Sequence, residues 1–254
     1  GILNGTTNFI MTRMIQDGMS FENALKLAQK NGYAEANPAA DVEGQDACRK
    51  ICILAAIAFG KHVYPEEVHT EGITEITRED VAAASAAGYV IKLIGRAKKT
   101  QGKLMAMVSP ALIPKSSQLA NVSDVFNGIL VRGSDTGDVV FYGRGAGKLP
   151  TASAVISDVV DAVKAGGHID TLGWEDTDHD TVGDYLLDTA PMMFRMAADR
   201  APASFGEVRP IEGTSKDECA FLTGPLSGLA VQELCREADD ADTPVLSAFR
   251  ILEY

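Results

Sequence analysis

The spacing of apolar side chains predicts that the first part of the chain is helical. Apolar residues recur at i, i+3, i+4 and i+7, which places them on one face of a helix. Thr6 or Thr7 is positioned to cap the first helix and Ser20 the second, while Gly18 and Gly60 suit the left-handed turn that ends a helix. The predicted helices cover residues 7–16, 21–30 and 42–59, with a polar loop over 33–41.

Strand-like stretches of apolar residues follow the helices. The predicted strands cover residues 89–97, 103–108, 124–131 and 137–142, and a further helix covers 150–164. We expect the first two strands to form a hairpin with its turn at 100–102, and all four to form one small sheet. Residues 110–120 hold two prolines and are expected to be irregular. Helices followed by consecutive strands favour an α+β fold, with helices on a small mixed or antiparallel sheet.

An acidic segment, residues 168–180, predicts a linker between a first unit, 1–167, and a second unit, 181–254. The second unit is predicted to contain strands near 185–187, 205–211, 218–223 and 245–252, and helices over 191–200 and 227–238. This β-α-β-β-α-β order is the ferredoxin-like arrangement.

Charge and composition restrict the classes of partner. The chain has 254 residues, of which 23 are basic and 35 acidic, so its formal net charge is −12. Such a field repels phosphate backbones and anionic lipids, which argues against nucleic acid and membrane surfaces. The longest apolar run, Ile51 to Phe59, is about half the ~20 residues that a membrane-spanning helix needs.

The cysteines and histidines indicate a cytoplasmic protein without a metal site. We expect buried, reduced thiols at Cys48, Cys52, Cys219 and Cys235. The four histidines are scattered and form no zinc pattern. The N-terminus is not a secretory signal and has no initiator Met, and we expect a piece of a longer protein.

Asp46 and Lys50 are candidate catalytic residues because they are four apart on one predicted helix and share a face. As an exposed ion pair they would contribute only about 0.3–0.5 kcal/mol. However, they follow a loop with three more carboxylates, at Glu35, Asp41 and Glu43. Burial against the following apolar run would lower the pKa of Lys50, whereas an ionised Asp46 would raise it. Taken alone, the pair is best interpreted as an exposed ion pair; if Lys50 does move a proton, these two effects favour its acting mostly as a donor.

A glycine-rich segment, Tyr142-Gly-Arg-Gly-Ala-Gly-Lys-Leu-Pro-Thr151, precedes the helix predicted over 150–164. Backbone N–H groups in such a loop can hold a phosphate. The spacing matches neither a Walker A loop nor the dinucleotide fingerprint of a βαβ unit. A tight turn between a strand and a helix explains the glycines equally well.

Five motifs along residues 1–165 suggest a family. They are Gly1-Ile-Leu-Asn-Gly-Thr-Thr-Asn-Phe-Ile10, Gly32-Tyr-Ala-Glu-Ala-Asn-Pro-Ala-Ala-Asp-Val-Glu-Gly-Gln-Asp-Ala-Cys-Arg-Lys50, Ala58-Phe-Gly60, Ile91-Lys-Leu-Ile-Gly95, and Tyr142-Gly-Arg-Gly-Ala-Gly147 with Pro150-Thr-Ala-Ser-Ala154. In this order they resemble the catalytic domain of homoserine dehydrogenases.

The resemblance implies an oxidoreductase that interconverts homoserine and aspartate 4-semialdehyde with NAD or NADP, in threonine and methionine biosynthesis. It implies that Lys50 donates or accepts the proton beside Asp46. The remaining implied site residues are Glu35 for the substrate ammonium, Tyr33, Asp41, Gly5 and Thr6 for the substrate pocket, and Gly145 and Gly147 for the cofactor.

Two features of the sequence depart from the family's pattern. The N-terminal Rossmann domain, which holds the main cofactor site, is absent, so we expect the chain to be inactive alone. Asn37 and Ala40 stand where many members carry aspartates.

The second unit resembles an ACT domain weakly. Its predicted turn over 187–193 has no glycine, and Pro191 lacks an N–H, so we expect assembly into a homodimer or higher oligomer rather than threonine sensing. A non-catalytic amino-acid-binding protein and an oligomerisation fragment are the alternatives to an enzyme.

Overall fold

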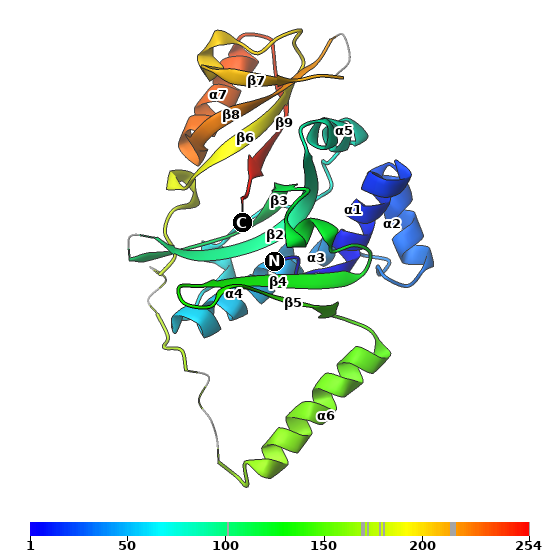
Figure 1. The fold of residues 1–254 in the computed structure, drawn as a ribbon, viewed down its shortest axis with the longest axis vertical. Coiled ribbons are helices and arrows are strands. Elements are labelled where there is room, and N and C mark those ends of the chain that lie inside the picture. Colours follow the sequence, from blue (N-terminus) through cyan, green and yellow to red (C-terminus); the bar gives the residue numbers. More distant parts are fainter. Residues whose placement is uncertain are drawn as a thin grey trace.

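The computed structural model describes residues 1–100, 102–168, 171, 173–177, 179, 181–213 and 217–253 (Figure 1). The helices are α1 (Gly5–Asp17), α2 (Phe21–Lys30), α3 (Ala39–Val42), α4 (Gln45–Phe59), α5 (Arg78–Ala86), α6 (Lys148–Lys164) and α7 (Gly228–Asp240). The strands are β1 (His69–Thr70), β2 (Tyr89–Thr100), β3 (Lys103–Pro114), β4 (Phe126–Gly133), β5 (Gly137–Arg144), β6 (Thr189–Met196), β7 (Val208–Ile211), β8 (Cys219–Ser227) and β9 (Val245–Ile251). Short 3-10 turns are η1 (Pro65–Glu67), η2 (Gln118–Asn121), η3 (Tyr185–Leu187) and η4 (Ala203–Phe205).

One sheet of seven strands contains strands from both predicted units. Its order is β1-β3-β9-β6-β8-β7, and β2 pairs with β3 along its whole length. The two units meet where β9 runs parallel to β3, with Ala111 opposite Arg250 and Leu112 opposite Ile251. The α+β fold class is therefore confirmed, and the second unit extends the sheet of the first.

The hairpin of β4 and β5 lies outside that sheet. It forms a separate two-stranded sheet, so the prediction of one small sheet from all four strands is wrong. The N-terminal segment lies between the two sheets. Gly1 hydrogen-bonds with Gly95 of β2, and Ile2 exchanges backbone hydrogen bonds with Gly128 of β4. Because of this double pairing, the start of α1 has a fixed position between β2 and β4.

The helix ends show why two predicted starts shifted. Asn4 caps α1 by accepting a hydrogen bond from Thr7 N, so the cap predicted at Thr6 or Thr7 is wrong. The helix predicted from Val42 begins at Gln45, because Gly44 has a φ of 83° and separates it from the short α3. The cap of α2 at Ser20 is confirmed.

Helix α5 was not predicted, although its capping box was a readable signal. The backbone N–H of Asp80 donates to the Thr77 hydroxyl, and the Asp80 carboxylate accepts from the Thr77 backbone. This reciprocal pair satisfies two donors at the helix start.

Two stretches predicted otherwise are strands. The prediction that residues 110–120 are irregular is wrong for the first of these residues, because β3 continues to Pro114. Ala111, Leu112 and Ile113 are each 0% exposed. The free energy gained by burying them outweighs the cost of the backbone hydrogen bonds that the prolines cannot donate. The helix predicted over 191–200 is also wrong, since β6 occupies Thr189–Met196 between β8 and β9.

The β-α-β-β-α-β order predicted for the second unit is also wrong, because it requires the helix over 191–200 that the structure does not have. From residue 189 the order of longer elements is β6, β7, β8, α7, β9, and the strand expected near 185–187 is the turn η3. The later strands and α7 stand in the predicted order. The side chains of Met192–Met196 are buried on both faces of the sheet, and a short apolar run of this kind does not distinguish a strand from a buried helix.

Parts of the predicted turn and linker, Gln101, Asp170, Asp178 and Asp180, lie outside the described residues. In the described part of the linker, Glu175 exchanges backbone hydrogen bonds with Gly60 and His62.

All four cysteines are free thiols, and three of them are buried. Among the described helices, none combines the length and the apolar character needed to cross a membrane.

Helix α6 stands apart from the rest of the fold as a separate arm (Figure 1). It has no buried residue, and it exposes large apolar side chains at Leu149, Val155, Ile156, Val159, Val160 and Val163.

Candidate active site

Residues Leu3 to Thr6, here called the α1 turn, contact most of the predicted site residues. This turn follows the segment that pairs with β2 and β4, and it enters α1 at Gly5. The Leu3 carbonyl accepts a hydrogen bond from Lys50 Nζ at 3.1 Å. The Thr6 hydroxyl donates to the Tyr33 carbonyl at 2.6 Å. The α1 turn therefore brings α4 and the loop after α2 together.

Asn4 is the central residue of this arrangement and is buried, with 5% exposure. Its Nδ2 donates to Asp41 Oδ1 at 2.7 Å and to Asp46 Oδ2 at 2.8 Å, while its Oδ1 caps α1. Lys50 Nζ lies 2.7 Å from the same oxygen of Asp46. Asp41, Asp46 and Lys50 are thus joined through one amide side chain. Sequence reasoning missed Asn4, although an asparagine directly before a helix is a strong capping signal.

Lys50 is more exposed than the sequence predicted. Its side chain is 47% exposed and that of Asp46 is 32% exposed. Ile53, expected to bury the lysine, is itself 52% exposed, and Ile57 on the same face of α4 is 62% exposed. The ammonium group therefore faces solvent on one side and the Asp46 carboxylate on the other.

The loop after α2 carries Tyr33 to the α1 turn, and Glu35 lies two residues further along the same loop. The Tyr33 ring makes an edge contact with Phe9 of α1, at 5.0 Å between centroids. Gln29 Nε2 donates to the backbone carbonyl of Glu35 at 3.1 Å, which fixes the loop. Glu35 is exposed, so its carboxylate is accessible to a ligand.

The glycine-rich segment approaches the α1 turn through Asn127 of β4. A methyl group on Gly145 would lie 2.9 Å from Cγ of Asn127, and one on Gly5 would lie 2.7 Å from the Val125 carbonyl oxygen. Gly5 therefore needs to be glycine, because backbone occupies the place of its Cβ, whereas a side chain at Gly145 would have to displace the Asn127 carboxamide. Gly147 precedes α6 with a φ of 115°, which a side chain would strain. The structure brings both Gly5 and Gly145 close to the Asn127 carboxamide.

A buried lysine supports the loop that leads into β4. Lys92 Nζ donates to the Val122 carbonyl at 2.6 Å and to Asn8 Oδ1 at 3.0 Å. The Asn8 amide in turn donates to the carbonyls of Val122, Asp124 and Phe126. Burial lowers the pKa of Lys92 to about 8. This network holds residues 122–126 against α1.

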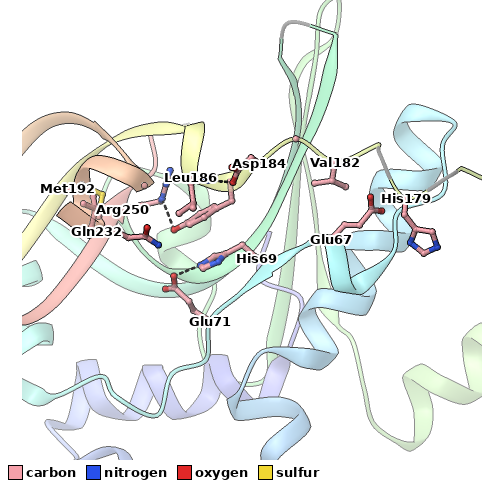
Figure 2. Close-up of a pocket in the computed structure, with 14 residues that line it drawn as sticks. Glu67, His69, Glu71, His179, Val182, Asp184, Leu186, Met192, Gln232 and Arg250 are labelled. Atoms are coloured by element: carbon pink, nitrogen blue, oxygen red, sulfur yellow. Dashed lines mark hydrogen bonds and ion pairs between the residues drawn. The ribbon is translucent and has the colours of Figure 1, made fainter. Parts of the chain in front are cut away.

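A cavity with a volume of about 630 Å³ lies elsewhere, between β1, α7 and β9 (Figure 2). The His69 ring stacks on Tyr185 at 3.7 Å, and the Arg250 guanidinium lies 4.3 Å from the centroid of the same ring. Asp188 binds Arg250 at 3.3 Å and Lys98 at 2.5 Å. The turn over 187–193 therefore joins β2 to β9 and enters a strand, rather than preceding a ligand-binding helix.

Comparisons with known proteins agree on one family. The family profile described as "Homoserine dehydrogenase" matches residues 1–160. Homoserine dehydrogenase of Synechocystis sp. is 51% identical over 167 residues, which are 64% of this chain and 39% of the relative. The Bacillus subtilis homoserine dehydrogenase is 46% identical over 164 residues, or 65% of this chain and 38% of the relative. The chain therefore spans about two-fifths of the length of these curated relatives.

Solved structures extend the likeness to the second unit. A homoserine dehydrogenase from Thiobacillus denitrificans superposes with a TM-score of 0.85 at 33% identity, covering 98% of this chain and 62% of that one. A hyperthermophilic archaeal homoserine dehydrogenase mutant in complex with NADPH matches 64% of this chain and 46% of that one, with a TM-score of 0.53 at 29% identity.

Proposed function

The chain belongs to the homoserine dehydrogenase family, and we propose that it forms the substrate-binding and acid–base part of an enzyme that interconverts L-homoserine and L-aspartate 4-semialdehyde. The observation that carries this proposal is the joining of Lys50, Asp46 and Asp41 through Asn4 at the start of α1. A reaction at an aldehyde carbonyl needs a proton source at the oxygen, and an ammonium group held by a carboxylate supplies one.

Lys50 is the proton donor in the reductive direction. Asp46 holds its Nζ at 2.7 Å and the Leu3 carbonyl holds it at 3.1 Å, so two acceptors aim the ammonium group. In the oxidative direction the same nitrogen, then a neutral amine, takes the hydroxyl proton of homoserine. Asp46 is a positioning group in both directions, because its Oδ2 is fixed by Asn4 as well.

The substrate carries an ammonium and a carboxylate, and the site offers a partner of each kind. Glu35 is an exposed carboxylate in the loop held to α1, and we assign it to the substrate ammonium. The first N–H groups of α1, at Gly5 and Thr6, precede the capped part of the helix. Such groups at a helix start attract a carboxylate.

The nicotinamide cofactor, NAD or NADP, supplies or accepts the hydride when it is bound. The glycines at the end of β5 fit a flat ring or a phosphate at close range. A methyl group on Gly143 would meet nothing within 4 Å, and one on Gly147 would meet only Pro150, at 3.7 Å. Gly143 and Gly147 thus leave the backbone open, whereas Gly145 packs against the Asn127 carboxamide. We assign Gly145 and Gly147 to the cofactor, and we place its main site in a separate domain, without which this chain is inactive.

The wider assignments belong to the same proposal. They are a cytoplasmic enzyme of threonine and methionine biosynthesis, a homodimer or higher oligomer, and a division into units 1–167 and 181–254 joined by 168–180. A non-catalytic amino-acid-binding or oligomerisation module is the competing function. It requires the Lys50–Asp46 pair to be a surface ion pair without catalytic effect.

Lys50→Ala in the assembled enzyme tests the proposal. By assembled enzyme we mean this chain joined to a cofactor domain, either in a longer natural chain or behind the N-terminal domain of a family member. We expect kcat for aspartate semialdehyde reduction to fall by about 10²–10⁴ without a change in thermal stability. Lys61→Ala is the matched control, since Lys61 pairs with Glu175 on the surface. Equal turnover of the two variants would favour the non-catalytic module.

A further inference from the structure

Asn127 lies beside both of the segments that the proposed function assigns to substrate and to cofactor. A methyl group on Gly145 would lie within 3.0 Å of its Cγ, Nδ2 and Oδ1 atoms, and one on Gly5 would lie 3.4 Å from its Oδ1. One carboxamide therefore lies against both the glycine-rich segment and the α1 turn. Neither motif analysis nor the charge pattern singled out this residue.

The Oδ1 atom of Asn127 is enclosed and has no hydrogen-bond donor among the described residues. Burying a carbonyl oxygen without a donor is unfavourable, and most native structures avoid it. A packing role alone would be served better by an apolar side chain of the same size. The amide at this position therefore calls for a donor that arrives with a ligand or with closure of the glycine-rich segment.

The backbone of Asn127 is held from three directions. Asn127 pairs with Gly143 across the β4–β5 hairpin, and its neighbour Gly128 exchanges hydrogen bonds with Ile2. On the preceding side, Asn8 holds the Phe126 carbonyl at 3.0 Å. The backbone of Asn127 consequently has a fixed position, and a change in spacing would have to come from the glycine-rich segment or the α1 turn.

We propose that Asn127 is a positioning residue, whose carboxamide sets the separation between the glycine-rich segment and the α1 turn when both ligands are bound. This inference rests on the proposed function. In the proposed function the glycine-rich segment would hold the cofactor and the α1 turn would hold the substrate, so the separation of the two segments would set the distance for hydride transfer. An error of about 1 Å in their separation can lower the rate about 10²-fold.

The experiment compares Asn127→Leu and Asn127→Ala in the assembled enzyme. Leucine fills nearly the same volume without polar atoms, whereas alanine removes the volume as well. We expect both variants to lose kcat by about 10–10²-fold, with KM for each substrate changed less than about threefold. With NADPH deuterated at the transferred position, the primary isotope effect on kcat rises, because a misaligned hydride transfer becomes rate-limiting.

The thermal midpoint separates positioning from a purely structural role. Because Asn127→Leu removes an enclosed oxygen without a donor, we expect its Tm to equal or exceed that of the wild type. Asn121→Ala is the control, since Asn121 is an exposed amide on η2 that contacts only the Ser117 carbonyl. It should leave kcat, the isotope effect and Tm unchanged.

Two results would overturn the inference. Normal turnover by Asn127→Leu would show that only the volume of the side chain matters. A lower Tm with an unchanged isotope effect would make Asn127 structural. An inactive wild-type assembled enzyme would instead contradict the proposed function itself, so the two failures are distinguishable.

Discussion

At the scale of single residues, the site depends on amides as much as on charges. Asn4 holds two carboxylates and caps a helix, Asn8 holds three backbone carbonyls, and Asn127 lies beside two glycines. An amide can donate and accept at once, so it can connect groups that charges alone would separate. In the proposed function the charged residues carry the chemistry, and Asn4 holds the two carboxylates of Asp41 and Asp46 in place.

Glu35→Gln tests the residue assigned to the substrate ammonium. The substitution keeps the size and removes the charge, so we expect KM for homoserine to rise about tenfold or more, with little change in kcat. The thermal midpoint should stay within about 1 °C, because an exposed side chain contributes little to stability. Steady-state kinetics of the assembled enzyme measures the first effect. Unchanged KM with lowered stability would make Glu35 a structural residue of the loop.

The lowered pKa of Lys92 predicts that the free energy of unfolding rises with pH. Burial lowers its pKa in the folded chain to about 8, from 10.5. Between these two pH values the unfolded chain binds a proton that the folded chain has released, so the free energy of unfolding increases with pH. The increase attributable to Lys92 is about 2 kcal/mol between pH 7.5 and pH 10.

Urea unfolding of the wild type and of Lys92→Met at these two pH values measures the Lys92 contribution. The stability difference between the two proteins should grow towards the higher pH in favour of the wild type. A constant difference would show that Lys92 titrates normally in the folded chain.

The candidate site could be predicted from sequence only in part, and the reason is physical. Asp46 and Lys50 share a helix, so local spacing is enough to bring them together. Gly5, Asn127 and Gly145 meet through strand pairing across more than a hundred residues, which no local pattern contains. The exposure of Lys50 was also beyond local reasoning, because it depends on what covers that face of α4.

At the scale of elements, β6 and α6 show the two ways in which an apolar run is ambiguous. Residues 190–196 form a strand because neighbours on both sides bury them. Residues 148–164 form the predicted helix, yet none of them is buried. In both cases the sequence shows that the run is apolar, but it does not show which neighbouring elements, if any, bury its side chains. Helix ends, which depend on a few local residues, were more predictable than strand neighbours.

Because helix α6 is exposed, we expect a charged substitution on it to change the free energy of unfolding very little. Ile156 is 62% exposed on an arm without buried residues, whereas Ile10 of α1 is 0% exposed. We expect Ile156→Asp to change the free energy of unfolding of this chain by less than about 0.5 kcal/mol. Ile10→Asp, the control, should prevent stable folding. Urea denaturation distinguishes them, and a large loss for Ile156→Asp would show that α6 packs on the chain in solution.

At the scale of the whole molecule, a buried ionic network reinforces the shared sheet. Arg195 of β6 lies 2.9 Å from Asp80 of α5 and 2.8 Å from Glu218 near β8. Ser247 of β9 also donates to Asp80, whose side chain is 0% exposed. These contacts join α5 of the first predicted unit to three segments of the second.

Arg195→Ala should therefore destabilise the molecule as a whole. It leaves Asp80 buried without its guanidinium, and we expect the free energy of unfolding to fall by about 3–5 kcal/mol in one transition. The double variant Arg195→Met with Asp80→Leu replaces both charges and should recover much of that loss. Equilibrium unfolding followed by two spectroscopic probes measures both. A second, separate transition would show that the two units fold independently.

The parallel contact between β3 and β9 also has a consequence for the time course of folding. Its partners, Ala111 and Arg250, are 250 − 111 = 139 positions apart. Loops of that length close slowly, so contacts of this kind form late and set the overall rate. Until β9 arrives, the edge of β3 offers unpaired N–H and C=O groups beside an apolar face. A second, incompletely folded copy can pair with that edge, so refolding yield should fall as protein concentration rises.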